Sequence, residues 1–271
     1  MISFIDWNVD PVIVSIGSYN LLYYSLSWAI AFMIAMWVFS KMLKREKMDA
    51  KLLDSAFMYA FISTVVGARL GHCFFYEFST YIADPIRILN LREGGLASHG
   101  AACGLLVGLW LFSKKNKLKY IWTLDHIVTV IPISGACIRF GNLMNSEIYG
   151  NPTGTDFGFR FIENIWQWRA GAEPIYSAPS HPTQIYEAGI YIVLFFILLY
   201  MYYKDATIKY PGLIFGVFLI WLFGGRLIIE FIKLPQVSFE SMMTLNMGQI
   251  LSVPFVILGI VIMNLSLRKK L

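Results

Sequence analysis

Residues 121–143, IWTLDHIVTVIPISGACIRFGNL, form an apolar run long enough to cross a lipid bilayer. About 20 helical residues, rising about 1.5 Å each, cover the hydrocarbon core. The run passes into RFGNLMNSEIYG (139–150), which places an arginine, two asparagines and a glutamate within nine positions. The stretch therefore predicts a membrane helix that carries a polar site at one end.

The rest of the chain has a similar composition. Of its 271 residues, 57% are hydrophobic and 14% are charged, which lies outside the balance of a soluble globular domain. We predict an all-α, polytopic integral membrane protein that forms a single membrane domain over 1–271. Seven windows are long and apolar enough to span: 21–40, 53–76, 96–113, 121–143, 186–203, 211–232 and 247–266.

The distribution of Lys and Arg predicts the orientation of these spans. Fourteen of the 22 basic residues lie in the segments that follow the first, third, fifth and seventh windows. By the positive-inside rule these segments face the cytoplasm, so the N-terminus is expected outside and the C-terminus inside. Topology thus explains the net charge of +5, and we expect no nucleic-acid partner.

Three arginines fall inside predicted spans, namely Arg69, Arg139 and Arg226. A charge within the hydrocarbon is costly, so it usually faces a polar cavity. Counted from the cytoplasmic ends, each lies about 15 to 18 residues along its span, or roughly 22 to 27 Å. All three reach a similar depth in the outer half, where the windows also place His99 and Tyr24.

Two explanations fit these arginines. They can snorkel to the outer interface, or pair structurally with Glu147 and Glu230. Alternatively they gather with His99 and Asn142 around one pocket for an anion, because guanidinium groups bind phosphate bidentately. Three costly burials at one depth favour the pocket, and the most abundant anion at that depth is a phospholipid headgroup.

The segments between the windows add three expectations. Segment 150–185 is long and rich in aromatic residues, and we expect it to form a small external cap. The loop 77–95 is expected to include a short interfacial helix. Glycines spaced by four predict close packing of the second and third spans: Gly67, Gly71, Gly100, Gly104 and Gly108.

Neither cysteine nor histidine usage suggests a metal site. Cys73, Cys103 and Cys137 all fall in apolar windows and are too scattered for a disulfide framework or a metal motif. The four histidines are equally dispersed. We therefore expect no metal and no cofactor.

The spacing R-x-G-N-x-x-N-x-E-x-x-G at 139–150 resembles the signature of bacterial prolipoprotein diacylglyceryl transferases. Further segments resemble that family in the same order and cover nearly the whole chain: GARLGHCFFY (67–76), GGLASHG (94–100), SHPTQIYEA (180–188), GGRLIIEF (224–231) and MGQILSVP (247–254). The resemblance implies a multi-pass protein of the bacterial inner (cytoplasmic) membrane. Its N-terminus and cap would then be periplasmic, and its C-terminus cytoplasmic.

The family implies transfer of the sn-1,2-diacylglyceryl group from phosphatidylglycerol to the lipobox cysteine thiol of a prolipoprotein. A thioether forms and glycerol phosphate leaves, as the first step of lipoprotein maturation. The implied partners are phosphatidylglycerol, the prolipoprotein signal peptide and membrane lipids. The resemblance implies catalytic roles for His99, Arg139 and Arg226. It implies substrate binding by Arg139, Asn142, Glu147, Gly150 and Tyr24, and the charge pattern adds Arg69 and Glu230 as substrate-binding candidates.

The residue chemistry is compatible with this activity. Displacing a phosphate ester needs a thiolate and neutralisation of the leaving group. Imidazole titrates near neutrality, so His99 is the candidate proton acceptor, while Arg139 and Arg226 would hold the phosphate. One departure from the family pattern is Leu222, since many members carry a tyrosine there, one turn before Arg226. Tyr24 or Tyr23 would then have to supply a hydroxyl contact.

A small-anion membrane transporter is the alternative function, because it also needs intramembrane arginines. A transport path should continue polar residues toward the cytoplasm, and many transporters contain inverted repeats. The cytoplasmic halves of the second, third and sixth windows are almost wholly apolar, and no such repeat is evident. The sequence therefore favours the transferase.

Overall fold

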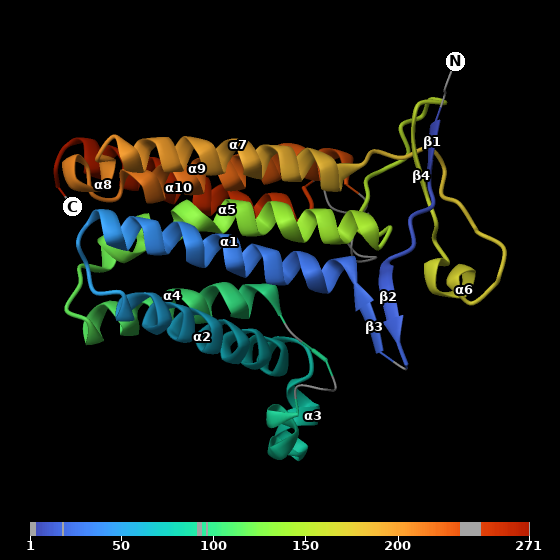
Figure 1. Cartoon of the computed structure of the whole chain (residues 1–271), viewed down its shortest axis with the longest axis horizontal. Helices are drawn as coiled ribbons and strands as arrows, with labels where there is room; N and C mark the ends of the chain where they lie inside the picture. Colours follow the sequence, from blue (N-terminus) through green and yellow to red (C-terminus); the bar gives the residue numbers. More distant parts are fainter. Residues whose placement is uncertain (1–3, 18, 91–93, 96, 234–244, 271) are drawn as a thin grey trace. The chain divides into compact units, whose positions relative to one another are not determined.

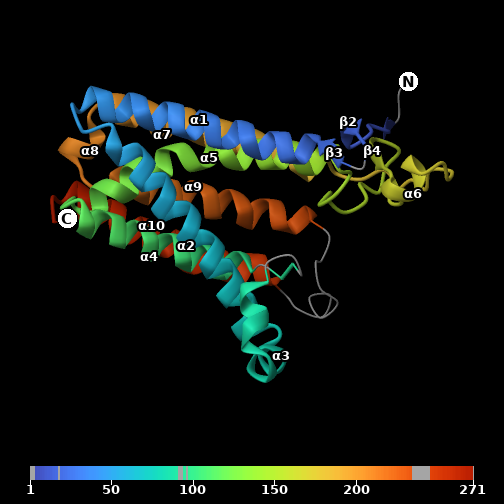
Figure 2. The ribbon, with the colours of Figure 1, turned by 60° about the horizontal axis from the view of Figure 1, so that its bottom comes forward.

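The computed structural model describes residues 4–17, 19–90, 94–95, 97–233 and 245–270, which are mostly helical (Figures 1 and 2). Within these residues, six helices are long and apolar enough to cross a membrane. The chain is therefore a polytopic membrane protein. The six helices are α1 (Tyr23–Arg45), α2 (Lys51–Phe75), α5 (Tyr120–Met144), α7 (Thr183–Tyr203), α9 (Leu213–Ile229) and α10 (Met247–Leu267).

Six of the seven predicted windows coincide with these helices. The remaining window, 96–113, falls on α4 (Ser98–Lys115), which has 18 residues. Its apolar part is shorter because His99 lies at one end and Lys114 and Lys115 at the other.

The chain divides into two compact units. Unit one comprises residues 1–37 and 127–271, and unit two comprises residues 38–126. The boundaries fall within α1 and α5, so each of these helices contributes to both units.

In unit two, α2 and α4 form an antiparallel pair with glycines at the contact. A Cβ atom added at Gly100 would lie 2.2 Å from the carbonyl oxygen of Gly67, and one added at Gly104 would lie 2.2 Å from that of Ser63. Only hydrogen fits at these positions, which confirms the close packing predicted from the glycine spacing. The short helix expected in 77–95 is also present, as α3 (Phe78–Ala83), followed by the 3₁₀ helix η1 (Pro85–Leu89).

In unit one, α9 packs against both α7 and α10. The short helix α8 (Ala206–Lys209) connects α7 to α9, so these two helices run antiparallel (Figure 1). Gly216 and Gly259 allow α9 and α10 to approach, because a Cβ at Gly259 would lie 2.9 Å from the Gly216 carbonyl oxygen. The 3₁₀ helix η3 (Glu230–Ile232) continues α9.

The N-terminus and segment 150–185 fold together, which the all-α prediction did not include. The described residues contain two two-stranded sheets. Strand β1 (Phe4–Trp7) pairs in parallel with β4 (Gly158–Phe161), and β2 (Val12–Ile16) pairs antiparallel with β3 (Tyr19–Leu22). Helix α6 (Ile165–Arg169) follows β4. Leu143, Met144 and Phe161 form the core of this cap, with Trp7 and Tyr149 packed against it.

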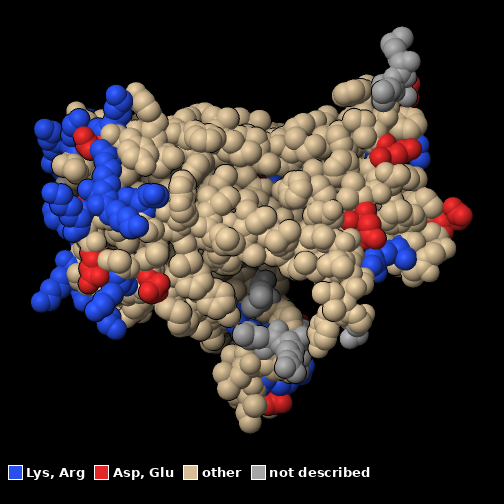
Figure 3. Space-filling view, in the orientation of Figure 1, with Lys and Arg blue, Asp and Glu red and all other residues tan. Residues whose placement is uncertain are grey.

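The two ends of unit one differ in their charged residues. Basic side chains lie where α7 leads into α8 and where α10 ends, namely Lys204, Lys209, Arg268, Lys269 and Lys270. Figure 3 shows that Lys and Arg gather at the end of the molecule where Figure 1 labels α8 and the C-terminus. The signature segment 139–150 lies at the opposite end of α5, next to the cap. Unit one therefore has one basic end and one end that carries the candidate site.

Candidate active site

Arg139 lies near the C-terminal end of α5 and is held by two side chains. Its Nε atom is 2.6 Å from a carboxylate oxygen of Glu187, in the first turns of α7. Its Nη1 donates to the Asn142 side chain at 3.1 Å. The other Glu187 oxygen accepts from Lys233 Nζ at 3.2 Å. One carboxylate, with a side chain only 3% exposed, therefore bridges two cations, which offsets the cost of burying it.

Arg226 on α9 is held more loosely. Its Nε atom lies 3.9 Å from Glu230 Oε2, one helical turn further along. The Arg226 side chain is 45% exposed, whereas that of Glu230 is 7% exposed. The Arg226 donors thus remain accessible to a ligand.

Tyr191 on α7 lies next to Arg139. Its phenol is beside the Arg139 guanidinium and within electrostatic reach of Glu187 and Arg226. Its ring packs on α5, where a Cβ added at Gly135 would lie 2.9 Å from Tyr191 Cδ2. We call the following residues the arginine cluster: Arg139, Glu187, Tyr191, Arg226, Glu230 and Lys233.

Glu230 also contacts the N-terminus of α10. A Cβ added at Gly248 would lie 2.5 Å from the Glu230 carboxyl carbon, so a side chain there would displace the carboxylate. Asn246 caps α10 through a bond from Gln249 N at 2.9 Å, and its amide donates to the Glu230 carbonyl at 3.3 Å. The carboxylate therefore lies at the N-terminal end of α10, next to the positive end of the helix dipole.

The signature loop after α5 is organised around Glu147. Its Oε1 accepts from Asn142 Nδ2 at 2.8 Å and from Asn145 Nδ2 at 3.3 Å, and its carbonyl accepts from Gln184 at 2.8 Å. Ile148 has φ +60°, a left-handed conformation that is strained for a β-branched residue. Glu147 thus links Asn142, the neighbour of Arg139, to the start of α7.

Gly150 and Tyr24 are placed by close packing. At Gly150 a Cβ would lie 2.5 Å from the Ile232 carbonyl oxygen and 2.7 Å from Thr183 Cγ2, so the loop passes between η3 and α7 only with glycine here. Tyr24, in the first turn of α1, packs on α5, where a Cβ at Gly141 would lie 2.8 Å from its Cδ2. Gly150 is thus the last residue of the signature segment and Tyr24 packs against that segment, while their direct contact with substrate stays a prediction.

Arg69, in unit two, is used differently from Arg139. All of its side-chain nitrogens donate to backbone carbonyls, with Nε to Ile88 at 2.9 Å, Nη1 to Gly94 at 2.6 Å and Nη2 to Arg87 at 2.6 Å. Its guanidinium also lies 5.0 Å from the centroid of the Tyr81 ring. This geometry favours a role in holding the segment before α4. Substrate binding by Arg69 stays a prediction.

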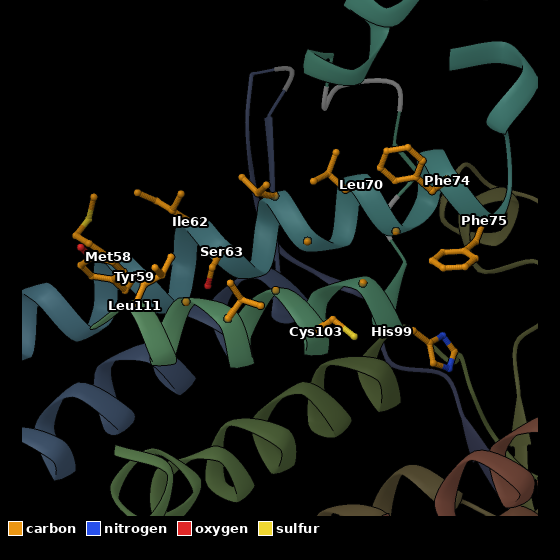
Figure 4. A pocket seen from close by; sticks show the side chains of 17 residues that line it. Met58, Tyr59, Ile62, Ser63, Leu70, Phe74, Phe75, His99, Cys103 and Leu111 are labelled. Atoms are coloured by element: carbon orange, nitrogen blue, oxygen red, sulfur yellow. The ribbon is translucent and has the colours of Figure 1, made fainter. Parts of the chain in front are cut away.

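His99, in the first turn of α4, lies at one end of an apolar groove in unit two. The groove, with a volume of about 790 Å³, runs along the α2–α4 pair (Figure 4). Its floor contains the contact glycines, and its walls include Met58, Ile62, Leu70 and Phe74 from α2 and Cys103 from α4. His99 and Arg69 belong to unit two, whereas the other predicted site residues belong to unit one. The association of His99 with the arginine cluster stays a prediction.

Comparison with known proteins identifies the family. The family model described as prolipoprotein diacylglyceryl transferase matches residues 11–265. The chain belongs to the prolipoprotein diacylglyceryl transferase family. It is similar to the phosphatidylglycerol–prolipoprotein diacylglyceryl transferase of Porphyromonas gingivalis, with 43% identity over 265 residues that cover 95% of this chain and 93% of that protein. The enzyme of the same name from Tolumonas auensis is 40% identical, covering 97% and 98%.

The family membership confirms the resemblance seen in the sequence. The chain is a diacylglyceryl transferase of lipoprotein biosynthesis with several membrane helices, and the family implies phosphatidylglycerol and prolipoproteins as its substrates. Within the described residues, no group of three or more His, Cys, Asp or Glu side chains is arranged to hold a metal ion.

The predicted site of this diacylglyceryl transferase omits three members of the arginine cluster, Glu187, Tyr191 and Lys233. A sequence signal existed for two of them, because Glu187 and Lys233 are charges at the ends of apolar spans. Tyr191 follows Glu187 by four residues on the same helix face. Its place beside Arg139 depends on the packing of α5 against α7, which no local pattern indicates.

Proposed function

We propose that this chain transfers the sn-1,2-diacylglyceryl group of phosphatidylglycerol to the lipobox cysteine of prolipoprotein signal peptides, at the periplasmic side of the bacterial inner membrane. The observation that carries the proposal is the arginine cluster, in which Arg139 from α5 contacts Glu187 and the Tyr191 phenol, and Arg226 from α9 lies within electrostatic reach of that phenol. Arg, Lys and Glu side chains are rarely buried in membrane helices without a function.

The charge of the cluster suits a phosphodiester. Its three cations, Arg139, Arg226 and Lys233, exceed its two carboxylates, Glu187 and Glu230, by one positive charge. The phosphodiester of phosphatidylglycerol carries one negative charge. Arg139 is fixed by Glu187 and would orient the phosphate, while the more exposed Arg226 would close on it.

The reaction is a displacement at the glyceryl carbon that bears the phosphate. The cysteine sulfur forms the new S–C bond, the C–O bond breaks, and its electron pair leaves with glycerol phosphate. The phosphate then gains a second negative charge, so guanidinium groups stabilise the transition state more than the ground state. We assign the thiol proton to His99, and no nucleophile from the enzyme is needed.

The membrane arrangement belongs to the same proposal. We take α4 as the seventh span, residues 1–271 as a single membrane domain and segment 150–185 as its periplasmic cap. The N-terminus is then periplasmic and the C-terminus cytoplasmic, in agreement with the positive-inside rule. The apolar groove along α2 and α4 would bind the acyl chains of membrane lipids. No nucleic-acid partner is proposed.

The test uses purified protein, phosphatidylglycerol vesicles and a lipobox peptide, with glycerol phosphate release and the peptide mass measured together. Arg139→Ala and Arg226→Ala should each lower turnover by about 10²-fold or more, as expected for loss of a group that stabilises developing charge. Arg268→Ala, at the other end of α10, is the control and should retain turnover. A wild-type protein that releases no glycerol phosphate, or arginine variants with full turnover, would contradict the proposal.

A further inference from the structure

Helix α9, which carries Arg226, contains no tyrosine, whereas Tyr191 lies on the neighbouring helix α7. Leu222, one turn before Arg226 on α9, offers no hydrogen-bond donor. Tyr191 lies beside Arg139 and within electrostatic reach of Arg226. We propose that Tyr191 supplies, from α7, a hydroxyl that donates to the lipid phosphate. This inference rests on the proposed function.

Helix packing places the two positions on the same side of the α7–α9 pair. Ile190 faces α9, since its Cγ2 atom lies 3.0 Å from a Cβ built at Gly225 and its carbonyl accepts from Trp221 Nε1 at 3.3 Å. Each residue turns by about 100° around an α-helix. Because the helices are antiparallel, the next residue on each turns to the same side. Tyr191 therefore borders the side that Leu222 and Arg226 occupy.

The hydrogen-bonding capacity of the phenol supports a donor role. A guanidinium group only donates, so Tyr191 can act toward Arg139 only as an acceptor. The phenol still has its own O–H to donate. A phosphate oxygen held between Arg139 and Arg226 would accept that proton in a hydrogen bond.

The ring of Tyr191 is positioned by its neighbours. Gly135 on α5 makes room for it, because a Cβ there would lie 2.9 Å from Tyr191 Cδ2. Glu187, four residues earlier, lies on the same face of α7 and is itself fixed by Arg139 at 2.6 Å. A hydroxyl held in this way needs little reorganisation when charge develops on the departing phosphate. Its contribution should therefore appear mainly in kcat.

The experiment compares kcat and KM for phosphatidylglycerol in wild type, Tyr191→Phe, Leu222→Tyr and the double variant. Tyr191→Phe removes only the hydroxyl and should lower kcat by about 10-fold to 100-fold, as for a hydrogen bond to a charged group, with KM little changed. The double variant should recover most of this loss, because a tyrosine at 222 restores a donor on the same side. Tyr200→Phe, at the far end of α7, is the control and should match wild type.

The outcomes separate this inference from the proposed function. Wild-type kcat in Tyr191→Phe would overturn it, and so would a loss that Leu222→Tyr fails to restore. Equal thermal unfolding midpoints for wild type and Tyr191→Phe would exclude a change in ring packing as the cause. Failure of the wild-type enzyme to modify the peptide would instead contradict the proposed function.

Discussion

Arg69 and Arg139 are the same residue type at a similar predicted depth, yet their surroundings differ. Arg139 pairs with the carboxylate of Glu187, whereas Arg69 donates to five backbone carbonyls of its own unit. Counting residues along each span predicts the depth of these two arginines in the membrane. It does not predict which groups accept their hydrogen bonds. The partners decide the role, because an arginine saturated by carbonyls has no donors left for a phosphate.

Substitution of Arg69 tests this distinction. Arg69→Lys keeps the charge but cannot reproduce the planar fork that reaches five carbonyls. We expect Arg69→Lys and Arg69→Met to increase amide hydrogen exchange in residues 84–90 to a similar extent, with Arg268→Lys as the unchanged control. If Arg69→Lys kept wild-type protection while Arg69→Met lost both protection and lipid binding, a role based on charge would be favoured instead.

Tyr149, in the cap, gives a pH-dependent prediction. Its hydroxyl donates to Glu163 at 3.2 Å, and burial together with this carboxylate raises its pKa from 10.0 to about 12. Between these values the unfolded chain loses the phenol proton while the folded chain keeps it, so the contribution of Tyr149 to stability falls as pH rises. Below pH 10 this contribution is constant.

The measurement is the thermal unfolding midpoint in detergent between pH 8 and pH 12, for wild type and Tyr149→Phe. The wild-type midpoint should fall more steeply above pH 10, since phenylalanine does not titrate and the other tyrosines contribute equally to both proteins. Parallel curves for the two proteins would show that the Tyr149 phenol is not perturbed.

At the scale of the elements, the α2–α4 contact depends on glycine. A methyl group at Gly104 would lie 2.2 Å from the Ser63 carbonyl oxygen, so Gly104→Ala should force the helices apart and destabilise the protein by about 1–3 kcal/mol. Gly189 on α7 has no heavy atom within 4 Å of a built Cβ, so Gly189→Ala should be neutral or stabilise by up to about 1 kcal/mol. Thermal unfolding in detergent distinguishes these signs, and equal effects would contradict the packing argument.

The elements also show what the sequence could predict. The windows 121–143 and 247–266 differ from α5 and α10 by only one residue at an end, because hydropathy is a local property. The cap strands were not predicted. Each has four or five residues, and β1 pairs Phe4 with Gly158, far along the chain. The candidate site differs in the same way. Arg139, Asn142 and Glu147 lie in one contiguous motif and were predicted, whereas Tyr191 lies far along the chain and was not.

At the scale of the whole molecule, the number of spans decides which side each terminus occupies. Six spans would place both termini on one side, and seven place them on opposite sides. Helix α4 decides between these cases. It runs antiparallel to α2 from the contact of Gly100 with Gly71 to that of Gly108 with Tyr59, and Lys115 lies 5.9 Å from the Tyr59 ring centroid. Helix α2 is long enough to span the bilayer, and α4 packs beside it from Gly71 to Tyr59. We therefore expect α4 to cross the bilayer in the opposite direction.

Reporter fusions test this topology directly. Alkaline phosphatase is active only outside the cytoplasm, and green fluorescent protein exported through the general secretion route does not fluoresce. Fusions after Asp84, before α4, should give phosphatase activity, whereas fusions after Asn116, at its C-terminal cap, and after Lys270 should give fluorescence. The two fusions that flank α4 are the decisive pair. If both reported the same side, α4 would not cross the membrane, and His99 at its first turn would lose its proposed place at the periplasmic surface.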